Sequence, residues 1–313
     1  MSKVEILMTG AYPEWDMVDL EANYTVHRLW ETPDKQRLLA DVGATVRAIA
    51  TRGELGASAE LMRQLPRLEI VSCYGVGTDA IDLSYARGRS IRVTNTPDVL
   101  TDDVADIGIA LLLATARHIP QADRFVREGQ WGKVAMPLVT RVSGKKLAIA
   151  GMGRIGQAMA KRATAFGCEI AYFARNRRRE LPYAFEPDLA VLARWADFLI
   201  VIVPGGEATK ALVDGEVLSA LGPKGIFINV SRGSTVDEEA LITALRNGSI
   251  QAAGLDVFLN EPNIDPRFYA MENVVLHPHH GSGTIETRKA MGQLARDNLA
   301  AHFEGRPLPT PVV

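Results

Sequence analysis

The chain has 313 residues, of which 47% are hydrophobic and 23% are charged, and its formal net charge is −2. This length suits two domains better than one compact core, and a charge so close to zero gives no support for a nucleic-acid or membrane-surface partner. No apolar run reaches the length of a membrane span and no signal peptide precedes the first strand-like run, so we expect a cytoplasmic protein.

The first 98 residues are predicted to form a small α/β unit of their own. Its strand-like runs are residues 4–8, 46–51, 68–73 and 91–94. The turn at residues 74–79 follows the third run, and its glycines can expose backbone N–H groups that would suit a carboxylate. An ordinary turn explains this segment equally well.

A long helix is predicted for residues 101–126, because its first turn is rich in aspartate, which favours a helix start. Its middle, residues 107–116, is apolar on nearly every side. Such a helix must be buried all round, in a core or against another subunit, and we predict a homodimer that uses it. Trp131 follows the helix and would then reach a neighbouring active site, although a place in the core is the more ordinary role for a tryptophan.

Residues 146–179 carry the most informative motif of the chain. A strand-like run at 147–150 leads into Gly151-Met152-Gly153-Arg154-Ile155-Gly156, and a helical pattern and a second strand-like run at 169–173 follow. This is the glycine fingerprint of a dinucleotide site, in which the pyrophosphate binds at the helix N-terminus. A glycine-rich turn without a ligand is the alternative, and the flanking strands and helix argue against it.

The end of the second strand indicates which dinucleotide binds. NAD sites place Asp or Glu about 20 residues beyond the fingerprint, where it holds the ribose 2′-hydroxyl. Here the segment is Ala174-Arg175-Asn176-Arg177-Arg178-Arg179, with no acidic residue before Glu180. Guanidinium groups suit a 2′-phosphate, so we predict NADP(H) as the preferred cofactor, with NAD(H) and a merely solvated basic turn left open.

Four further apolar runs lie at residues 198–203, 226–230, 253–257 and 274–276, with helical segments near 214–221 and 237–247 between them and a last helix at 286–305. Continuous apolar runs are typical of strands buried on both faces of a parallel sheet, so the pattern predicts a doubly wound fold. Ligands of such folds bind beyond the carboxyl ends of the strands. Arg232, Glu261 and His279 each follow one of these runs.

These three side chains together fit the reduction of a small 2-oxo acid. Histidine is the usual proton donor near neutral pH, a carboxylate stabilises its imidazolium, and arginine clamps a substrate carboxylate. Taken singly, Arg232 could be a surface residue and Glu261 part of an ordinary turn. His277, His279 and His280 could form a metal cluster, but no carboxylate or cysteine lies at a familiar metal-ligand spacing, and we predict no metal.

Taken together, the motifs resemble the D-2-hydroxyacid dehydrogenase family, and especially its glyoxylate/hydroxypyruvate reductase branch, which includes the plant-type hydroxyphenylpyruvate reductases. The matching segments cover nearly the whole chain: residues 92–106, 151–156, 229–233, 254–258, 261–262, 278–284 and 308–313. The resemblance implies two doubly wound parallel-sheet α/β domains, with a Rossmann cofactor domain inserted into a flavodoxin-like split catalytic domain. Residues 1–98 and 285–313 would be the catalytic domain, and residues 99–284 would bind the dinucleotide and carry the dimerisation arm.

The resemblance also implies roles for single residues. His279 would be the acid/base, Glu261 would pair with it, and Arg232 would bind substrate. Further substrate contacts would come from Val76, Gly77 and Trp131. Cofactor contacts would come from Gly151, Met152, Gly153, Arg154, Ile155, Gly156, Ala174, Arg175, Asn176, Val230 and Asp256, the last near the nicotinamide carboxamide. No role is carried over to His280.

One loop departs from the family pattern. Where the family usually has Pro-Leu-Thr-Pro-Glu-Thr-Thr, this chain has Pro-Gly-Gly-Glu-Ala-Thr-Lys at residues 204–210, so we assign that loop no cofactor contact. The predicted activity is NADPH-dependent reduction of glyoxylate or hydroxypyruvate to a D-2-hydroxy acid. An aromatic substrate such as 4-hydroxyphenylpyruvate and a non-enzymatic dinucleotide-sensing module of the corepressor type are the alternatives, and formate or phosphoglycerate oxidation fits poorly.

Overall fold

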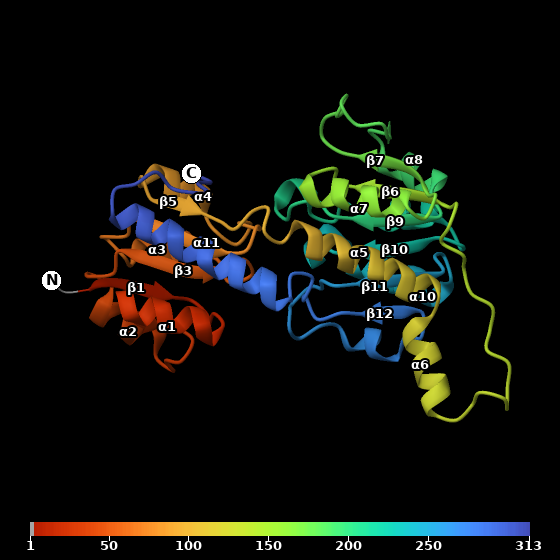
Figure 1. Ribbon diagram of the computed structural model, residues 1–313, viewed down its shortest axis with the longest axis horizontal. Coiled ribbons are helices and arrows are strands. Elements are labelled where there is room, and N and C mark those ends of the chain that lie inside the picture. Colours follow the sequence, from red (N-terminus) through yellow and green to blue (C-terminus); the bar gives the residue numbers. More distant parts are fainter. Residues whose placement is uncertain (1–2) are drawn as a thin grey trace. The chain divides into compact units, whose positions relative to one another are not determined.

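The computed structural model describes residues 3–313, which divide into two compact units (Figure 1). The first unit consists of the chain up to Leu100 together with Ser282–Val313, and the second unit is Thr101–Gly281. Each unit is built on its own parallel β-sheet. These sheets confirm the predicted fold class of two parallel-sheet α/β domains.

A five-stranded sheet in the order β2-β1-β3-β4-β5 forms the centre of the first unit. Its strands are β1 (Val4–Met8), β2 (Tyr24–Arg28), β3 (Ala48–Arg52), β4 (Ile70–Tyr74) and β5 (Arg92–Thr94). This is the flavodoxin-like order, in which the winding reverses between β1 and β3. Ligands of such sheets bind at the carboxyl ends of the strands beside that switch point, and Arg52 is the last residue of β3.

Helices pack on both faces of this sheet: α1 (Glu14–Asn23), α2 (Lys35–Val42), α3 (Ala59–Arg63), α4 (Leu83–Gly88) and α11 (Ile285–Phe303). Val71 of β4 belongs to a buried core that includes side chains from β1, β3 and α3. The next residue, Ser72, points to the other face, where its Oγ donates to Ala295 O of α11 (3.0 Å). At the C-terminal end, Val312 N donates to Val93 O of β5 (2.7 Å), which ties the last residues to the same unit.

The second unit contains a seven-stranded sheet in the order β12-β11-β10-β9-β6-β7-β8. Its strands are β6 (Lys146–Ala150), β7 (Glu169–Phe173), β8 (Ala184–Phe185), β9 (Phe198–Val201), β10 (Ile226–Asn229), β11 (Ala252–Leu255) and β12 (Val274–Leu276). This is the Rossmann order with an additional strand, and its switch point lies between β6 and β9. Every residue of β9 and β10 is buried, as expected for strands covered on both faces.

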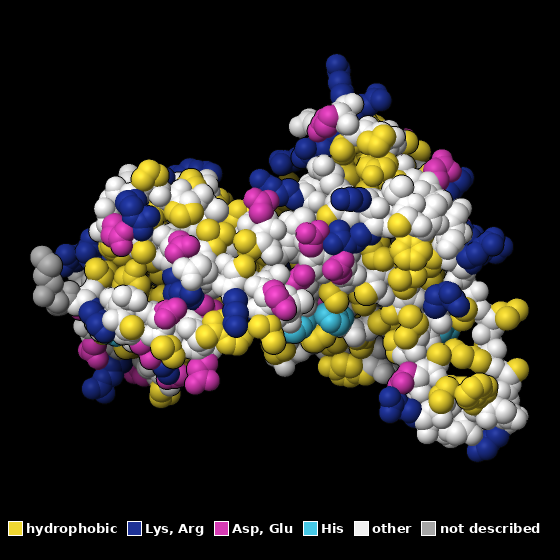
Figure 2. Space-filling view, viewed as in Figure 1, with side chains coloured by type: hydrophobic (Ala, Val, Ile, Leu, Met, Phe, Trp, Pro, Cys, Tyr) yellow, Lys and Arg dark blue, Asp and Glu magenta, His cyan; other side chains and the backbone are white. Residues whose placement is uncertain are grey.

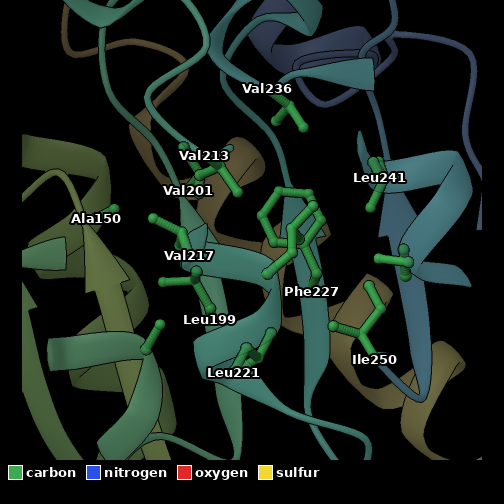
Figure 3. Close-up of a cluster of buried hydrophobic side chains, with 14 of the residues drawn as sticks. Ala150, Leu199, Val201, Val213, Val217, Leu221, Phe227, Val236, Leu241 and Ile250 are labelled. Carbon is green, nitrogen blue, oxygen red and sulfur yellow. The ribbon is translucent and has the colours of Figure 1, made fainter. Parts of the chain in front are cut away.

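The helices of the second unit are α5 (Thr101–Ala116), α6 (Ile119–Arg127), α7 (Arg154–Thr164), α8 (Leu189–Trp195), α9 (Gly215–Leu221) and α10 (Glu238–Asn247), with short 3-10 helices η1 (Glu207–Thr209), η2 (Gly233–Thr235) and η3 (Pro266–Ala270). Asp214 and Asp237 cap α9 and α10 by accepting hydrogen bonds from first-turn N–H groups. Figure 3 shows Phe227 of β10 packed among Leu199, Leu221 and other apolar side chains. Burying one such side chain contributes about 1.5–3 kcal/mol.

The prediction of one helix over residues 101–126 is wrong, because the structure has two helices there. α5 ends at Ala116, and His118 takes a left-handed φ of 51° before α6 begins at Ile119. Pro120 suits the first turn of α6 but has no N–H with which to continue α5. The strands β2 and β8 and the helix α8 were not predicted. No helix within residues 3–313 is both long and apolar enough to cross a membrane.

Candidate active site

The glycine fingerprint forms the turn between β6 and α7, at the switch point of the second unit. Gly151 has a φ of 108°, and a Cβ there would lie 2.4 Å from Ile202 O, so only glycine fits. A Cβ on Gly156 would lie 2.0 Å from the carbonyl oxygen of Gly151, so glycine allows α7 to start close against the turn. Apart from Gly153 and its two neighbours in the chain, no described residue has an atom within 4 Å of a Cβ built on Gly153, so space remains in front of the helix.

This open space is bounded by the N-terminus of α7. The backbone ladder of α7 begins where Gln157 N donates to Gly153 O (3.0 Å), so the N–H groups of Arg154, Ile155 and Gly156 precede it. Gly153 has no side chain to cap the helix. A helix N-terminus of this kind attracts anions through its N–H groups and its dipole. The fingerprint residues therefore fit the pyrophosphate of a dinucleotide.

The basic turn after β7 is anchored by Tyr172. The Tyr172 hydroxyl accepts a hydrogen bond from Arg178 N (2.7 Å) and donates to Arg178 O (3.2 Å). Arg178 Nη1 lies 3.5 Å from Glu180 Oε1, so this guanidinium already faces a carboxylate. Arg175 and Arg177 are exposed. Exposed guanidinium groups on an anchored turn fit the phosphate that distinguishes NADP from NAD.

The other predicted cofactor residues lie near the carboxyl ends of β6, β7 and β10. Met152 and Val230 are buried, Ala174 is half-buried and Asn176 is exposed. The loop at residues 204–210, which departs from the family pattern, is closed by a hydrogen bond that Thr209 Oγ1 donates to Pro204 O (2.6 Å).

Arg232 follows β10 in a segment that Asn229 organises. Asn229 Nδ2 donates to Arg232 O (3.1 Å), and Asn229 Oδ1 accepts from Ser231 N (3.0 Å). A Cβ on Gly233 would lie 2.0 Å from the carbonyl carbon of Phe258, so the segment after β10 packs directly on the segment after β11. This packing sets Arg232 beside the loop that carries the candidate carboxylate.

Glu261 and His279 form a hydrogen-bonded pair. His279 Nδ1 lies 2.6 Å from Glu261 Oε2, and Glu261 Oε1 accepts from Phe258 N (2.8 Å). An ionised carboxylate only accepts, so this network assigns the proton of neutral His279 to Nδ1 and leaves Nε2 for a reacting molecule. Both side chains are partly exposed and therefore accessible to a ligand.

The surroundings of Glu261 keep it ionised. Burial by itself raises the pKa of Glu261, but the hydrogen bond and charge of His279, the N–H of Phe258 and the charge of Arg232 bring that pKa below its ordinary value of 4.5. An ionised Glu261 stabilises the protonated form of His279. The structure thus brings together the three residues singled out as a set: Arg232, Glu261 and His279.

Asp256, predicted to lie near the nicotinamide, is almost fully buried after β11. Its Oδ1 lies 2.6 Å from His277 Nδ1 and accepts from His280 N (2.9 Å), and its Oδ2 accepts from Gly281 N (3.1 Å). Both carboxylate oxygens are therefore engaged by residues of the same unit. The contact of Asp256 with a cofactor stays a prediction.

Three other residues are predicted to bind substrate. Val76 and Gly77 follow β4 in the first unit, where their carbonyl oxygens accept from Asn95 Nδ2 (2.8 Å) and Cys73 Sγ (3.5 Å). Trp131 lies after α6 in the second unit and is 80% exposed, so it does not belong to the core of the chain. Their contacts with substrate stay predictions.

Comparison with known proteins decides the family. A model described as D-isomer specific 2-hydroxyacid dehydrogenase, NAD binding domain, matches residues 109–281, more than half of the chain. The chain belongs to the D-isomer specific 2-hydroxyacid dehydrogenase family. The resemblance seen in the sequence motifs is therefore confirmed.

Several members of this dehydrogenase family match the chain over its full length. It is 46% identical to glyoxylate/hydroxypyruvate reductase A of Arabidopsis thaliana and 45% identical to hydroxyphenylpyruvate reductase of Plectranthus scutellarioides, and each alignment covers 100% of both chains. The crystal structure of NADPH-dependent glyoxylate/hydroxypyruvate reductase from Sinorhizobium meliloti, in complex with NADP and malonate, matches with a TM-score of 0.94. That match has 46% identity and covers 100% of this chain and 97% of that chain.

In this family member, three site contacts were not predicted from the sequence: those of Asn229, Tyr172 and His277. A signal existed for Asn229, which is the polar last residue of an apolar run just before Arg232. Tyr172 and His277 gave no such signal, because their partners depend on how loops return to the sheet. Within residues 3–313 no group of three or more His, Cys, Asp or Glu side chains is arranged to hold a metal ion.

Proposed function

We propose that the protein is an NADPH-dependent reductase of small 2-oxo acids, which converts glyoxylate to glycolate and hydroxypyruvate to D-glycerate. The observation that carries the proposal is the pair of His279 Nδ1 and Glu261 Oε2, 2.6 Å apart, with Arg232 beside it. The names of the Arabidopsis and Sinorhizobium relatives support the same activity.

Each of the three residues has one task in this reaction. Arg232 binds the substrate carboxylate with its two-pronged guanidinium and orients the neighbouring carbonyl. His279 donates a proton from Nε2 to the carbonyl oxygen, and Glu261 holds Nδ1 and stabilises the imidazolium beforehand. NADPH supplies the hydride when it is bound.

The second unit holds the cofactor in this proposal. The first turn of α7, with Met152, Gly153, Arg154 and Ile155, binds the pyrophosphate. Arg175 and Arg177 bind the 2′-phosphate, since they are exposed on a turn that Tyr172 anchors. The first unit contributes Val76 and Gly77, which contact the substrate.

The carboxyl edge of the first sheet favours a small polar substrate over an aromatic one. Arg52 Nε lies 2.6 Å from Glu54 Oε1, and both side chains are about two-fifths exposed beside the switch point. A Cβ on Gly75 would lie 3.5 Å from Gly53 N, so the turns after β3 and β4 are neighbours. An ion pair can exchange hydrogen bonds with a hydroxymethyl group, whereas covering it with an aromatic ring costs desolvation. We therefore place hydroxypyruvate ahead of 4-hydroxyphenylpyruvate.

The proposed assembly is a homodimer formed through α5, α6 and the segment after α6. Figure 1 shows α6 standing away from the sheet of its unit, and hydrophobic side chains gather over this arm in Figure 2. The exposed hydrophobic residues of the arm include Ile119, Val126, Val134 and Leu138. Apolar side chains in such number on a projecting arm indicate a covered surface. Light scattering tests this proposal, and a monomer at micromolar concentration would refute it.

The function is tested by following oxidation of NADPH and of NADH with glyoxylate, hydroxypyruvate and 4-hydroxyphenylpyruvate in parallel. We expect turnover with the first two acids and a clear preference for NADPH. Equal use of NADH would mean that the basic turn is only solvated. No turnover with either cofactor and a broader panel of 2-oxo acids would overturn the proposal in favour of a dinucleotide-sensing module. The predicted cytoplasmic location is a separate proposal, tested by cell fractionation.

A further inference from the structure

A second histidine–carboxylate pair lies on the loop that carries His279. Asp256 is buried at the end of β11, and its carboxylate accepts hydrogen bonds from His277 Nδ1 (2.6 Å), His280 N (2.9 Å) and Gly281 N (3.1 Å). All three donors belong to one short segment after β12. A buried carboxylate is tolerated only when such donors surround it.

This carboxylate holds the loop on both sides of His279. His279 has a φ of 50°, a left-handed conformation that costs a non-glycine residue free energy and persists only when its surroundings impose it. Its own N–H donates to Asp256 O (2.8 Å), while the Asp256 side chain holds His277 before it and Gly281 after it. The left-handed conformation of His279 is therefore held by hydrogen bonds that His279 and its neighbours donate to one residue, Asp256.

The same aspartate is joined to the segment of Arg232. Asp256 N donates to Asn229 O (2.9 Å), and Asn229 Nδ2 donates to Arg232 O (3.1 Å). One chain of hydrogen bonds thus connects the loops after β10, β11 and β12. A shift of Asp256 would change the position of both His279 and Arg232.

We propose that His277 is a positioning residue, which fixes the Asp256 carboxylate and through it the catalytic conformation of His279. Of the three donors to this carboxylate, His277 is the side-chain donor, so it can be removed while both backbone donors stay. Without it the carboxylate loses its shortest hydrogen bond and can turn away from the N–H groups of His280 and Gly281. A displacement of about 1 Å at a reacting group can lower turnover about 100-fold.

The experiment compares His277→Leu, His277→Asn and His277→Gln with the wild type, using glyoxylate and NADPH. The Asn amide nitrogen can take the place of Nδ1, whereas the Gln amide nitrogen lies further out, where Nε2 was. We expect His277→Leu to lower kcat about 10- to 100-fold, a larger change than any in KM for glyoxylate or in the NADPH dissociation constant. His277→Asn should recover most of kcat, and His277→Gln should recover less.

The matched control is His27→Leu, which removes another partly exposed histidine whose ring is paired with a carboxylate. His27 Nε2 lies 2.8 Å from Glu5 Oε2 on β2 and β1, in the first unit. This variant should keep the wild-type kcat even if it loses thermal stability. An equal kcat loss in His27→Leu would show that the effect is a general loss of stability and would overturn the inference.

The inference rests on the proposed function, and the same assay distinguishes their failures. A wild-type protein that does not oxidise NADPH refutes the proposed function. An active wild type with an equally active His277→Leu refutes only the role of His277. If His277→Leu does not fold, the order of kcat for His277→Asn and His277→Gln decides, and a Gln variant as active as the Asn variant would contradict the inference.

Discussion

The two sheets carry different kinds of groups on their carboxyl edges. On the seven-stranded sheet, Asp256 and Asn229 are buried and tied to the loops around them, and Glu261 is engaged through both of its oxygens. On the five-stranded sheet, the charged groups Arg52 and Glu54 form an exposed ion pair. An ion pair of this kind contributes only about 0–1 kcal/mol to stability.

This difference corresponds to two different tasks. Proton transfer and carbonyl polarisation need groups held in one geometry before the substrate arrives, which a buried hydrogen-bond network supplies. Contact with the variable part of a substrate tolerates exposed side chains, because it changes affinity and selectivity rather than the reacting geometry. We therefore infer that the second unit carries out the chemistry and that the first unit selects the substrate.

The largest effect on turnover is expected when His279, the proposed proton donor, is replaced. His279→Gln removes the proton donor, so kcat should fall about 1,000-fold with glyoxylate and with hydroxypyruvate alike. Steady-state assays measure this loss, and a fluorescence titration should show that NADPH still binds. A variant within tenfold of the wild-type kcat would mean that another group donates the proton.

A smaller effect is expected at the basic turn. The double change Arg175→Ser and Arg177→Ser removes charge-assisted hydrogen bonds to the 2′-phosphate, so KM for NADPH should rise about 10- to 100-fold. The kinetic constants with NADH should change little. Arg178→Ser is the comparison, and its effect should be smaller because Arg178 already faces Glu180. Equal effects in both variants would contradict the assignment.

The carboxyl edge of the five-stranded sheet, which carries Arg52, should respond to mutation differently from the carboxyl edge of the seven-stranded sheet. Arg52→Leu removes a donor that a hydroxymethyl group can use, so kcat/KM for hydroxypyruvate should fall roughly tenfold. Glyoxylate has only hydrogen in that place and should be reduced as before. If Arg52→Leu lowers kcat/KM equally for both acids, the separation of tasks between the two edges is wrong.

The smallest effect concerns acid stability. Because the pKa of folded Glu261 lies below its ordinary value of 4.5, its ionised form stabilises the fold above that pH, and this contribution is lost as pH falls through the lower folded value. The difference in unfolding free energy between wild type and Glu261→Gln should therefore shrink in acid. Urea unfolding at a series of pH values measures it. A difference that grows as pH falls would have the wrong sign.

Much of this site could be predicted from the sequence because its signals are local. The fingerprint glycines and the apolar runs that precede Arg232 and His279 are contiguous patterns. The failures have physical reasons. β2 is a partly exposed edge strand without a continuous apolar run. The break between α5 and α6 depends on the left-handed backbone conformation of His118, and the signal for it in the sequence was Pro120.

The contacts of His277 could not be predicted. His277 precedes the catalytic residue by two positions, but its partner Asp256 lies 21 residues earlier on the neighbouring strand. The contact depends on the register of β11 and β12, in which Leu255 is opposite Leu276. A sequence shows that both strands exist, and only the folded sheet shows which strand ends face each other.

The proposed reaction is tested most directly by its stoichiometry and stereochemistry. Purified protein is mixed with NADPH and hydroxypyruvate, the loss of NADPH is followed by absorbance, and the glycerate formed is assigned to one enantiomer. We expect one D-glycerate for each NADPH consumed. Formation of L-glycerate, or no loss of NADPH, would contradict the proposed reaction.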